Sequence, residues 1–558
     1  MFDCLIRGGK IVDGTGNPWF WGDVAVKDGR IAAIRKTAKP SVAEERCGTS
    51  CSAADPQDEW TASTTIDASG CVVMPGIVDL HTHSDGTIPT NPGAKSSLLQ
   101  GVTSECTGLC GISEFPTHSS EEWSDLAGFR DYVNRNGTGI NIVPLVGHGA
   151  VRTFVMGPEG KGGERCFPET EEMKAMEEAV RIAMEQGAFG ITTGLIYAPG
   201  RNAAPAEVEA LCRVAASYGG VHCSHVRSEE DMLIEGVEEL LATVRSTGIP
   251  SSISHHKAMG RRNWGKPSET VRMIDRARKE GLDVICDFYP WVIAATSNLA
   301  GRFAAGLARK PGQAVDRETV LAALKDDAEW SAVKKRLREA FVEEKRINDE
   351  RKAALLPHGA AVRDARDLRY WEVVSYSPSH PEFFTLTFEE VAKKLGFDDY
   401  WDAMRRLYLE DEGETRTGAG PMCEEDILTI LGSPYSVIAS DSSTSDSRTG
   451  GHPRAYGNFG RALVRFVKEL GAISLESLVK KMTSQPATFV GLHDRGAIRR
   501  GAWADLVVLD WENFESPADF ANPHESPRGI RYVLVNGQIA VKDGQVTGLR
   551  AGKVLSKE

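Results

Sequence analysis

The middle of the chain repeats one pattern eight times: a short apolar run rich in β-branched residues, followed in most cases by a longer stretch typical of a helix. The runs are Gly76–Leu80, Val102–Ser104, Ile140–Val146, Gly190–Gly194, Gly220–Ser224, Pro250–Ser254, Asp283–Cys286 and Tyr435–Ala439. Strands that alternate with helices favour an α/β fold with a parallel sheet. Polar residues follow nearly every run, and a barrel would bring all of them to one rim. The sequence therefore predicts a (β/α)8 TIM-type barrel, with a doubly wound open sheet as the alternative.

Both ends of the chain carry a different pattern, in which strand-like runs alternate with two-residue turn signals. The signals are Gly8-Gly9, Asp13-Gly14, Asp28-Gly29, Asn536-Gly537 and Asp543-Gly544. Such pairs between β-branched runs are typical of hairpins. We expect residues 1–74 and 485–558 to meet in one small β-sandwich beside a barrel formed by residues 75–484. Residues 38–63, rich in small and acidic side chains, are expected to form a surface loop within the sandwich.

A long segment separates the seventh run from the eighth. Residues 300–425 are too many for one connection between neighbouring strands, and they include a charged stretch, Lys325–Lys352, with helical character. One apolar helix face is predicted within that stretch, formed by Trp330, Val333, Leu337, Ala340 and Phe341. We interpret residues 300–425 as a helical lid or subdomain inserted between barrel strands 7 and 8. For the charged stretch itself, a solvated helix without further function is the alternative.

The net charge and the apolar runs argue against several classes of partner. A formal charge of −13 disfavours nucleic acid or an anionic membrane. No run approaches the roughly 18 consecutive apolar residues of a membrane helix, and the first residues lack the pattern of a secretory signal. The 11 cysteines are odd in number and without framework spacing, which is typical of reduced thiols. We expect a cytoplasmic enzyme with a small-molecule substrate and no nucleic-acid or membrane partner, and we leave its oligomeric state open.

Potential metal ligands follow five of the eight runs. His81 and His83 come directly after the first run, and residues two apart on an extended strand project to the same side. Four further candidates stand at or just after other runs: Cys110, His225, His255 and Asp441. Imidazole, thiolate and carboxylate groups are suited to a divalent metal such as zinc. For Cys110 alone, an inert buried thiol would be the simpler interpretation, but five strand ends with such residues predict a metal site.

Together with their neighbours, these residues resemble a known family. The matching motifs are Pro75–Asp85, Gly101–Thr103, Cys110–Ser113, Gly147–Gly149, Gly194–Gly200, His225–Arg227, Ser254–Lys257, Asn263–Gly265, Tyr289-Pro290, Ser440-Asp441, His452–Arg454, Gln485–Ala487 and Ala504–Val507. The pattern is similar to the amidohydrolase superfamily and, within it, to the N-acyl-D-amino-acid deacylase (D-aminoacylase) group. The resemblance covers nearly the whole chain except residues 38–63 and much of residues 299–425. It implies hydrolysis of the amide bond of an N-acyl-D-amino acid.

The resemblance also implies how metal would be held. One tightly bound zinc would take Cys110, His225 and His255, and a second, weaker divalent site would take His81, His83 and Asp441. Most amidohydrolases bridge two metals with a modified lysine or a glutamate from the fourth strand. The fourth run, Gly190–Gly194, contains neither residue, which favours the group that uses a cysteine.

Roles for other residues follow from the same resemblance. Asp441 would accept a proton from the attacking water and return it to the leaving nitrogen. Tyr197 would donate a hydrogen bond to the developing oxyanion. Three residues would hold the α-carboxylate of the substrate: Lys257, Tyr289 and Arg454. We assign no metal to His148 or His256, because single histidines in such places are more often structural.

Three departures from the family pattern affect the expected specificity. Leu109 stands where the family usually has Asn, Ser442 stands where it usually has Gly, and residues 291–296 replace a small polar stretch. These changes leave the acyl group and the amino-acid side chain of the substrate open. Two other functions are considered: a cyclic-amide hydrolase of the hydantoinase or dihydroorotase kind, which normally needs the absent lysine, and a non-catalytic scaffold, which would have lost ligands.

Overall fold

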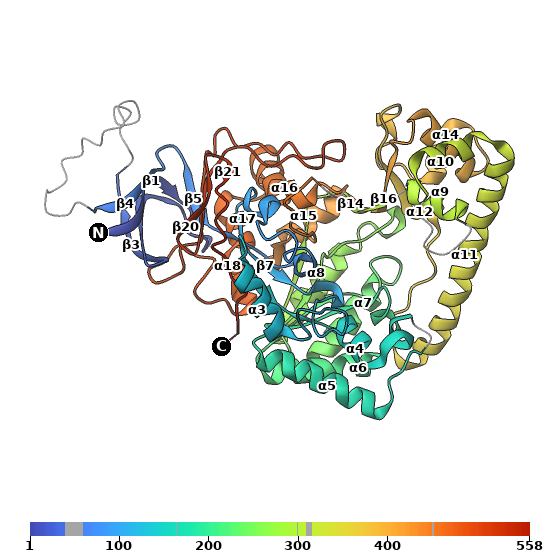
Figure 1. Cartoon of the computed structure of the whole chain (residues 1–558), viewed down its shortest axis with the longest axis horizontal. Helices are drawn as coiled ribbons and strands as arrows, with labels where there is room; N and C mark the ends of the chain where they lie inside the picture. The colour runs from blue at the N-terminus through green and yellow to red at the C-terminus, as the bar shows by residue number, and fades with distance from the viewer. Residues whose placement is uncertain (39–59, 163–164, 298, 309–314, 449–450, 558) are drawn as a thin grey trace.

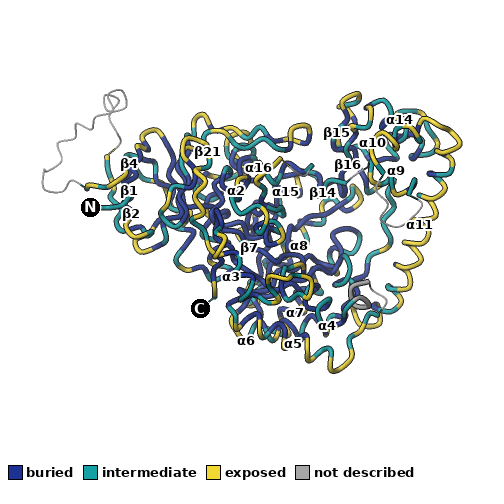
Figure 2. Tube along the Cα trace, in the orientation of Figure 1, coloured by how far each residue is buried: buried dark blue, intermediate teal, exposed yellow. Residues whose placement is uncertain are grey.

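A computed structural model describes residues 1–38, 60–162, 165–297, 299–308, 315–448 and 451–557 (Figure 1). The predicted surface loop at residues 38–63 lies largely outside these residues. In Figure 1 the strands from both chain ends lie together on one side, helices and strands of the middle follow, and α9–α14 lie on the opposite side. Buried residues are concentrated in the middle of the molecule, whereas α11 exposes much of its length (Figure 2).

All eight predicted runs form strands, and the third is divided in two at Leu145. The strands are β6 (Ile77–Asp79), β7 (Val102–Thr107), β8 (Asn141–Pro144), β9 (Val146–Gly147), β10 (Gly190–Gly194), β11 (Val221–His225), β12 (Ser251–Ile253), β13 (Val284–Phe288) and β17 (Ser436–Ile438). Every pairing among them is parallel. A parallel arrangement places all their carboxyl ends at one edge.

The parallel strands form two sheets that meet at two seams. One sheet has the order β6-β7-β8, and the other has the order β9-β10-β11-β12-β13-β17. At the first seam, β8 continues along the chain into β9. At the second, Thr82 and Ser442 form a parallel bridge, and the backbone N–H of Asp441 donates to the carbonyl oxygen of His81 at 2.9 Å. The result is a TIM-barrel-like α/β fold.

Side chains on these strands divide between two apolar cores. Val78, Cys223 and Val437 belong to one cluster of buried residues, whereas Ile191 and Ile438 belong to a larger cluster shared with the helices. Strands buried on both faces read as continuous apolar runs. That property made these strands recognisable in the sequence.

Helices follow most of the strands and pack on the outer side. Their bounds are α2 (Lys95–Leu98), α3 (Leu126–Asn136), α4 (His148–Gly162), α5 (Thr170–Glu185), α6 (Pro205–Ser217), α7 (Leu233–Thr247), α8 (Pro267–Lys279), α15 (Glu424–Gly432), α16 (Arg454–Ala462), α17 (Leu475–Met482) and α18 (Ser484–Val490). Local signals fix their ends: α6 and α8 begin with proline, and α7 ends at Gly248 with φ +72°. Among the helices that the structure describes, none has the length and apolarity needed to cross a membrane.

Strands from both ends of the chain join in one nine-stranded sheet. They are β1 (Phe2–Ile11), β2 (Phe20–Lys27), β3 (Arg30–Lys36), β4 (Ala62–Asp67), β5 (Val72–Pro75), β18 (Leu506–Leu509), β19 (Ile530–Val535), β20 (Gln538–Lys542) and β21 (Gln545–Val546). The two ends meet where β5 pairs antiparallel with β18. On β5, Val73 contributes to a core within this sheet, whereas Val72 and Met74 contribute to the core shared with the barrel helices. The sheet is therefore buried on both faces at this position.

The expected hairpin at Gly8-Gly9 is wrong. Both glycines lie inside the single strand β1, where the pairing with β2 shifts register between Ile6 and Gly9. Gly8 has φ +69°, and its N–H donates to the Asp23 carboxylate at 2.9 Å. A glycine with positive φ and a local register shift is a β-bulge, which bends a strand without ending it.

Residues between β13 and β17 form additional helices and a small antiparallel sheet. The elements are β14 (Ile293–Ser297), α9 (Leu299–Leu307), α10 (Arg317–Lys325), α11 (Asp327–Leu355), α12 (Leu368–Trp371), β15 (Glu372–Tyr376), α13 (Phe388–Leu395), α14 (Tyr400–Glu410) and β16 (Arg416–Pro421). They have a core of their own, which includes Phe303, Trp330 and Trp401. On α11 the predicted apolar face holds only in part. Trp330 and Val333 are buried, but Ala340 is exposed, because the later turns of this helix pack against little.

Candidate metal centre

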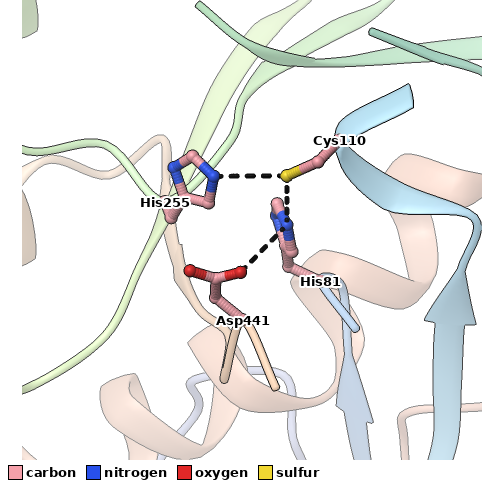
Figure 3. A group of neighbouring side chains, drawn as sticks. All are labelled: His81, Cys110, His255 and Asp441. Carbon is pink, nitrogen blue, oxygen red and sulfur yellow. Dashed lines mark hydrogen bonds and ion pairs between the residues drawn. The ribbon is translucent and has the colours of Figure 1, made fainter. Parts of the chain in front are cut away.

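The carboxyl ends of the parallel strands bring six predicted ligands together. His81 and His83 follow β6, Cys110 lies in a short 3-10 turn after β7, His225 ends β11, His255 follows β12 and Asp441 follows β17. The parallel pairing described above is what converts their wide spacing in sequence into proximity. Figure 3 shows four of them, His81, Cys110, His255 and Asp441, pointing toward one another.

The sulfur of Cys110 lies at the centre of three imidazole rings. Its Sγ is 3.2 Å from His81 Nε2, 3.6 Å from His225 Nδ1 and 3.3 Å from His255 Nε2. All four side chains are buried. His81, which the resemblance places in the weaker site, is thus as close to the sulfur as His255. The structure brings the two predicted groups together as one cluster.

Asp441 connects this cluster to His83. Its Oδ1 is 3.3 Å from His83 Nε2 and 3.5 Å from His81 Nε2, and its Oδ2 is 2.9 Å from the guanidinium of Arg454. Burial opposes ionisation of Asp441, but the charges of Arg454 and His255 outweigh it and hold its pKa well below the usual value. Asp441 is therefore a carboxylate at neutral pH.

The surroundings of Cys110 favour its ionised form. Burial alone would raise the pKa of its thiol, yet the charges of His81 and His255 and hydrogen bonds from His225 and His255 hold that pKa well below the usual value. Cys212, buried among aliphatic side chains of α6, shows the opposite behaviour, since burial raises its pKa. A lowered thiol pKa favours the thiolate, which is the form of cysteine that binds metal.

The distances from the Cys110 sulfur to the ring nitrogens can be compared with those around a zinc ion. Zinc lies about 2.3 Å from sulfur and about 2.0 Å from nitrogen, so tetrahedral angles separate the two ligand atoms by roughly 3.5 Å. The three measured sulfur–nitrogen distances, 3.2–3.6 Å, agree with this separation. Two sets of side chains in the described residues have ligand atoms close enough for one ion: His81, Cys110, His255 and Asp441, and His225, Glu229 and His255.

Two buried carboxylates that sequence reasoning missed lie behind the histidines. Asp287, on β13, places Oδ1 3.3 Å from His81 Nδ1 and accepts the backbone N–H of His255 at 2.6 Å. Glu229, in the loop after β11, contacts His225, His255 and Lys257. The four-residue spacing from His225 to Glu229 was the only signal for Glu229, since it lies in an acidic stretch that resembles a solvated loop.

The four remaining predicted site residues lie close to the cluster. The Tyr197 hydroxyl donates to the carbonyl oxygen of Cys110 at 3.1 Å, and its ring centroid is 5.1 Å from that of His225. The ring of Tyr289 contacts two cations, with Lys257 Nζ at 5.4 Å and Arg454 Cζ at 5.1 Å from its centroid. Burial raises the pKa of Tyr289 to about 12 and that of Tyr197 well above its usual value. Both phenols are therefore neutral hydrogen-bond donors.

A pocket of about 420 Å³ opens beside the cluster. His83, Asp441 and Arg454 line it, together with the hydroxyl-rich segment Ser442–Ser445 and Ser447. Of the three residues predicted to hold the substrate carboxylate, only Arg454 lines this pocket. Lys257 and Tyr289 border a much smaller space next to Met422.

The two histidines to which the sequence analysis assigned no metal contact other side chains. His148 Nε2 lies 2.7 Å from Glu207 Oε1, and His256 Nε2 lies 2.7 Å from Thr270 Oγ1. Neither belongs to the groups of side chains close enough to share an ion.

Comparison with known proteins shows the family of this chain. A family model described as the amidohydrolase family matches residues 64–327 and 425–541. The chain is 32% identical to an N-acyl-D-glutamate deacylase of Alcaligenes xylosoxydans xylosoxydans, over 100% of this chain and 97% of that protein. It is 29% identical to a D-aminoacylase of the same organism, over 100% of this chain and 98% of that protein.

Solved structures agree with the sequence comparisons. An N-acyl-D-glutamate deacylase from Bordetella bronchiseptica, complexed with zinc and a phosphonate inhibitor that mimics the tetrahedral intermediate, has a TM-score of 0.71 and 30% identity. The match covers 100% of this chain and 99% of that one. A D-aminoacylase with a binuclear metal centre has a TM-score of 0.72 and 28% identity, with 100% of both chains covered. The chain therefore belongs to the amidohydrolase family.

Proposed function

We propose that the protein is a zinc-dependent deacylase that hydrolyses the amide bond of an N-acyl-D-amino acid to a carboxylate and a free D-amino acid. One observation carries this proposal. A cysteine, three imidazoles and an aspartate lie close together at the carboxyl ends of the parallel strands, next to a polar pocket. Relatives named for the deacylation of N-acyl-D-glutamate and N-acyl-D-aspartate, and a D-aminoacylase, support the substrate class.

Zinc would be held by residues of the cluster. We assign the tight site to Cys110, His225 and His255, and a second, weaker divalent site to His81, His83 and Asp441. When bound, zinc would polarise the substrate carbonyl and lower the pKa of water at the site. The thiolate state of Cys110 and the sulfur–nitrogen distances support this choice of metal.

Asp441 would transfer the proton during hydrolysis. It would accept the proton of the attacking water and deliver it to the amide nitrogen as the C–N bond breaks. Its position supports this role, because it is ionised, buried and at the edge of the pocket. Tyr197, a neutral donor beside Cys110, would stabilise the oxyanion that forms at the carbonyl.

The α-carboxylate of the substrate would bind to Arg454, Lys257 and Tyr289. Arg454 presents a guanidinium to the pocket, and its planar fork suits a carboxylate. Arg454 contacts Asp441 at 2.9 Å in the structure. A substrate carboxylate would therefore share this guanidinium with the catalytic aspartate, which places the scissile amide near Asp441.

The finer points of the architecture belong to the same proposal. We infer that the bridge between Thr82 and Ser442 closes the parallel strands into an eight-stranded barrel, and that the terminal nine-stranded sheet folds over its own core as a sandwich. The divisions at residues 1–74 with 485–558, 75–484 and 300–425 are proposed as domains. A reducing, cytoplasmic location is supported by the nine described cysteines, which are all free.

A substrate panel tests the proposed activity. Zinc-loaded protein would be incubated with N-acetyl and longer N-acyl amino acids in D and L forms, and with a hydantoin and dihydroorotate, and amine or ring-opened product would be measured. We expect release of the free amine from D forms alone. Opening of the cyclic amides without cleavage of any N-acyl-D-amino acid would contradict the proposal and favour a cyclic-amide hydrolase. Absence of bound zinc would favour a non-catalytic scaffold.

A further inference from the structure

Glu229 lies behind the proposed zinc ligands and contacts three functional side chains at once. Its Oε2 is 3.3 Å from His225 Nε2, and its Oε1 is 2.9 Å from His255 Nδ1 and 2.5 Å from Lys257 Nζ. The side chain is 3% exposed. The backbone is fixed as well, because the N–H of Met259 donates to the Glu229 carbonyl oxygen at 2.7 Å.

Each histidine directs opposite ring nitrogens to Cys110 and to Glu229. His225 directs Nδ1 to the sulfur and Nε2 to Glu229, whereas His255 directs Nε2 to the sulfur and Nδ1 to Glu229. A nitrogen that binds metal must be unprotonated, so the other nitrogen of a neutral ring carries the hydrogen. A buried N–H needs an acceptor. The Glu229 carboxylate lies close to both of these nitrogens, 3.3 Å from His225 Nε2 and 2.9 Å from His255 Nδ1, while Lys257 Nζ lies 2.8 Å from His255 Nδ1.

We propose that Glu229 is a positioning residue that orients both zinc-binding histidines and the substrate-binding Lys257 through a single carboxylate. The inference rests on the proposed zinc site. One carboxylate offers about four lone-pair positions, enough for two imidazole N–H groups and one ammonium. By fixing the protonated nitrogen of each ring, Glu229 presents unprotonated nitrogens to the metal. By holding Lys257, it ties the position of the substrate carboxylate to that of the metal.

The test compares zinc affinity in E229Q with that in a matched variant. Glu207 is also a buried glutamate that contacts a histidine, His148, at 2.7 Å, but that histidine is no proposed ligand. A glutamine at 229 keeps one acceptor and presents an NH2 group to a second donor, so at least one partner is lost. We expect E229Q to bind zinc about 10–100-fold more weakly than the parent, measured by competition with a chelator. E207Q should bind zinc like the parent.

Two further variants separate positioning from general disruption. K257M should raise KM for an N-acyl-D-amino acid and weaken zinc binding less than E229Q does, because Lys257 contacts only one of the two histidines, His255, at Nδ1 and at its carbonyl oxygen. E229D, which keeps the charge in case E229Q folds poorly, should weaken zinc binding less than E229Q does. Equal zinc affinity in E229Q and the parent would overturn the inference, as would equal weakening in E229Q and E207Q.

The zinc measurement does not depend on the substrate. If the parent binds zinc but cleaves no N-acyl-D-amino acid, the proposed function fails, and the ratio of zinc affinities in E229Q and the parent still decides the role of Glu229. If the parent cleaves the substrate and E229Q has the same zinc affinity and the same KM as the parent, the proposed function stands and the inference about Glu229 fails.

Discussion

Three proposed ligands adopt a backbone conformation that side-chain-bearing residues rarely take. Cys110, His255 and Asp441 have φ values of +55°, +36° and +51°. Each such residue costs on the order of 1–3 kcal/mol, a strain that proteins keep mainly at functional sites. The backbone of Cys110 is closely packed, since a Cβ at Gly194 would lie 2.1 Å from the Cys110 carbonyl oxygen. Three of the nine non-glycine residues with positive φ in the described part of the chain are therefore proposed ligands.

Replacing Asp441 with asparagine should remove turnover while keeping the fold and the tight zinc. The amide cannot accept the proton, so we expect kcat to fall by roughly 10²–10⁴-fold. Steady-state kinetics, zinc content and melting temperature would be measured together. Asp446 provides the matched control, because it lies on the same loop and accepts backbone N–H groups of Gly93 and Lys95 instead. Near-parental kcat in D441N would show that another group is the base.

At the residue scale, the sequence indicates the candidate ligands better than the carboxylates that contact them. The six ligand candidates were recognisable because each follows an apolar run, and parallel strands align such positions at one rim. Glu229 and Asp287 carried no comparable signal. Glu229 stands in the run Ser228–Asp231, where acidic residues suggest solvent exposure, yet Glu229 and Glu230 are both buried. Whether a charged residue in a loop is buried depends on how the loop packs against distant parts of the chain. The local sequence does not show this packing.

At the scale of elements, burial on both faces explains which predictions held. The eight barrel strands were identifiable as apolar runs, and the turns at Asp28-Gly29 and Asn536-Gly537 do connect paired strands. The prediction at Gly8-Gly9 was wrong, because two glycines are compatible with either a turn or a bulge. Which of the two forms depends on how the strand pairs with its neighbour. The face predicted on α11 was too long, because periodicity shows which residues could be buried, not which have a neighbour.

The strand that precedes Asp441 depends on a buried lysine. Lys481 of α17 donates to the carbonyl oxygens of Ser433 and Ser436, at 2.5 and 3.0 Å, and to the Ser436 hydroxyl at 2.9 Å. Burial lowers its pKa from 10.5 to about 8. The folded protein therefore releases this proton at a lower pH than the unfolded chain does. Protonation of Lys481 lowers the stability of the fold below pH 8, and this penalty disappears as the pH rises to 10.5.

The pH dependence of stability in K481M tests this assignment. The difference in unfolding free energy between parent and K481M should shift in favour of the parent as pH rises from 8 to 10.5. The full shift is about 3 kcal/mol, from about 1.4 kcal/mol per pKa unit. Denaturant unfolding at several pH values would measure it, with K480M as the control at the neighbouring lysine. A difference that is independent of pH would show that Lys481 titrates normally.

At the scale of the whole molecule, the family model matches the chain in two parts separated by a long unmatched segment. The amidohydrolase model leaves residues 328–424 unmatched, and these lie within the segment that has its own apolar core. Specific contacts attach this segment to the barrel side, including Arg366 to Glu230 at 2.6 Å and the N–H of Ala361 to Glu239 at 3.1 Å. The sequence predicts an insertion at residues 300–425 from the length of the segment. It does not predict these contacts, because a few polar contacts between distant residues leave no periodic pattern in the sequence.

The proposed ligands span the sequence from His81 to Asp441, so zinc should stabilise the molecule as a whole. An ion that binds only the folded chain adds stability that grows with its concentration, about 4 kcal/mol at a thousand times Kd. We expect the melting temperature of the parent to rise when zinc is added and to fall with a chelator. C110A should lose most of this response, because the thiolate is the atom around which the three imidazoles gather. C212A, which removes a buried thiol of α6, should keep it. Equal zinc responses in C110A and the parent would mean that Cys110 is an ordinary buried thiol and that the metal binds elsewhere.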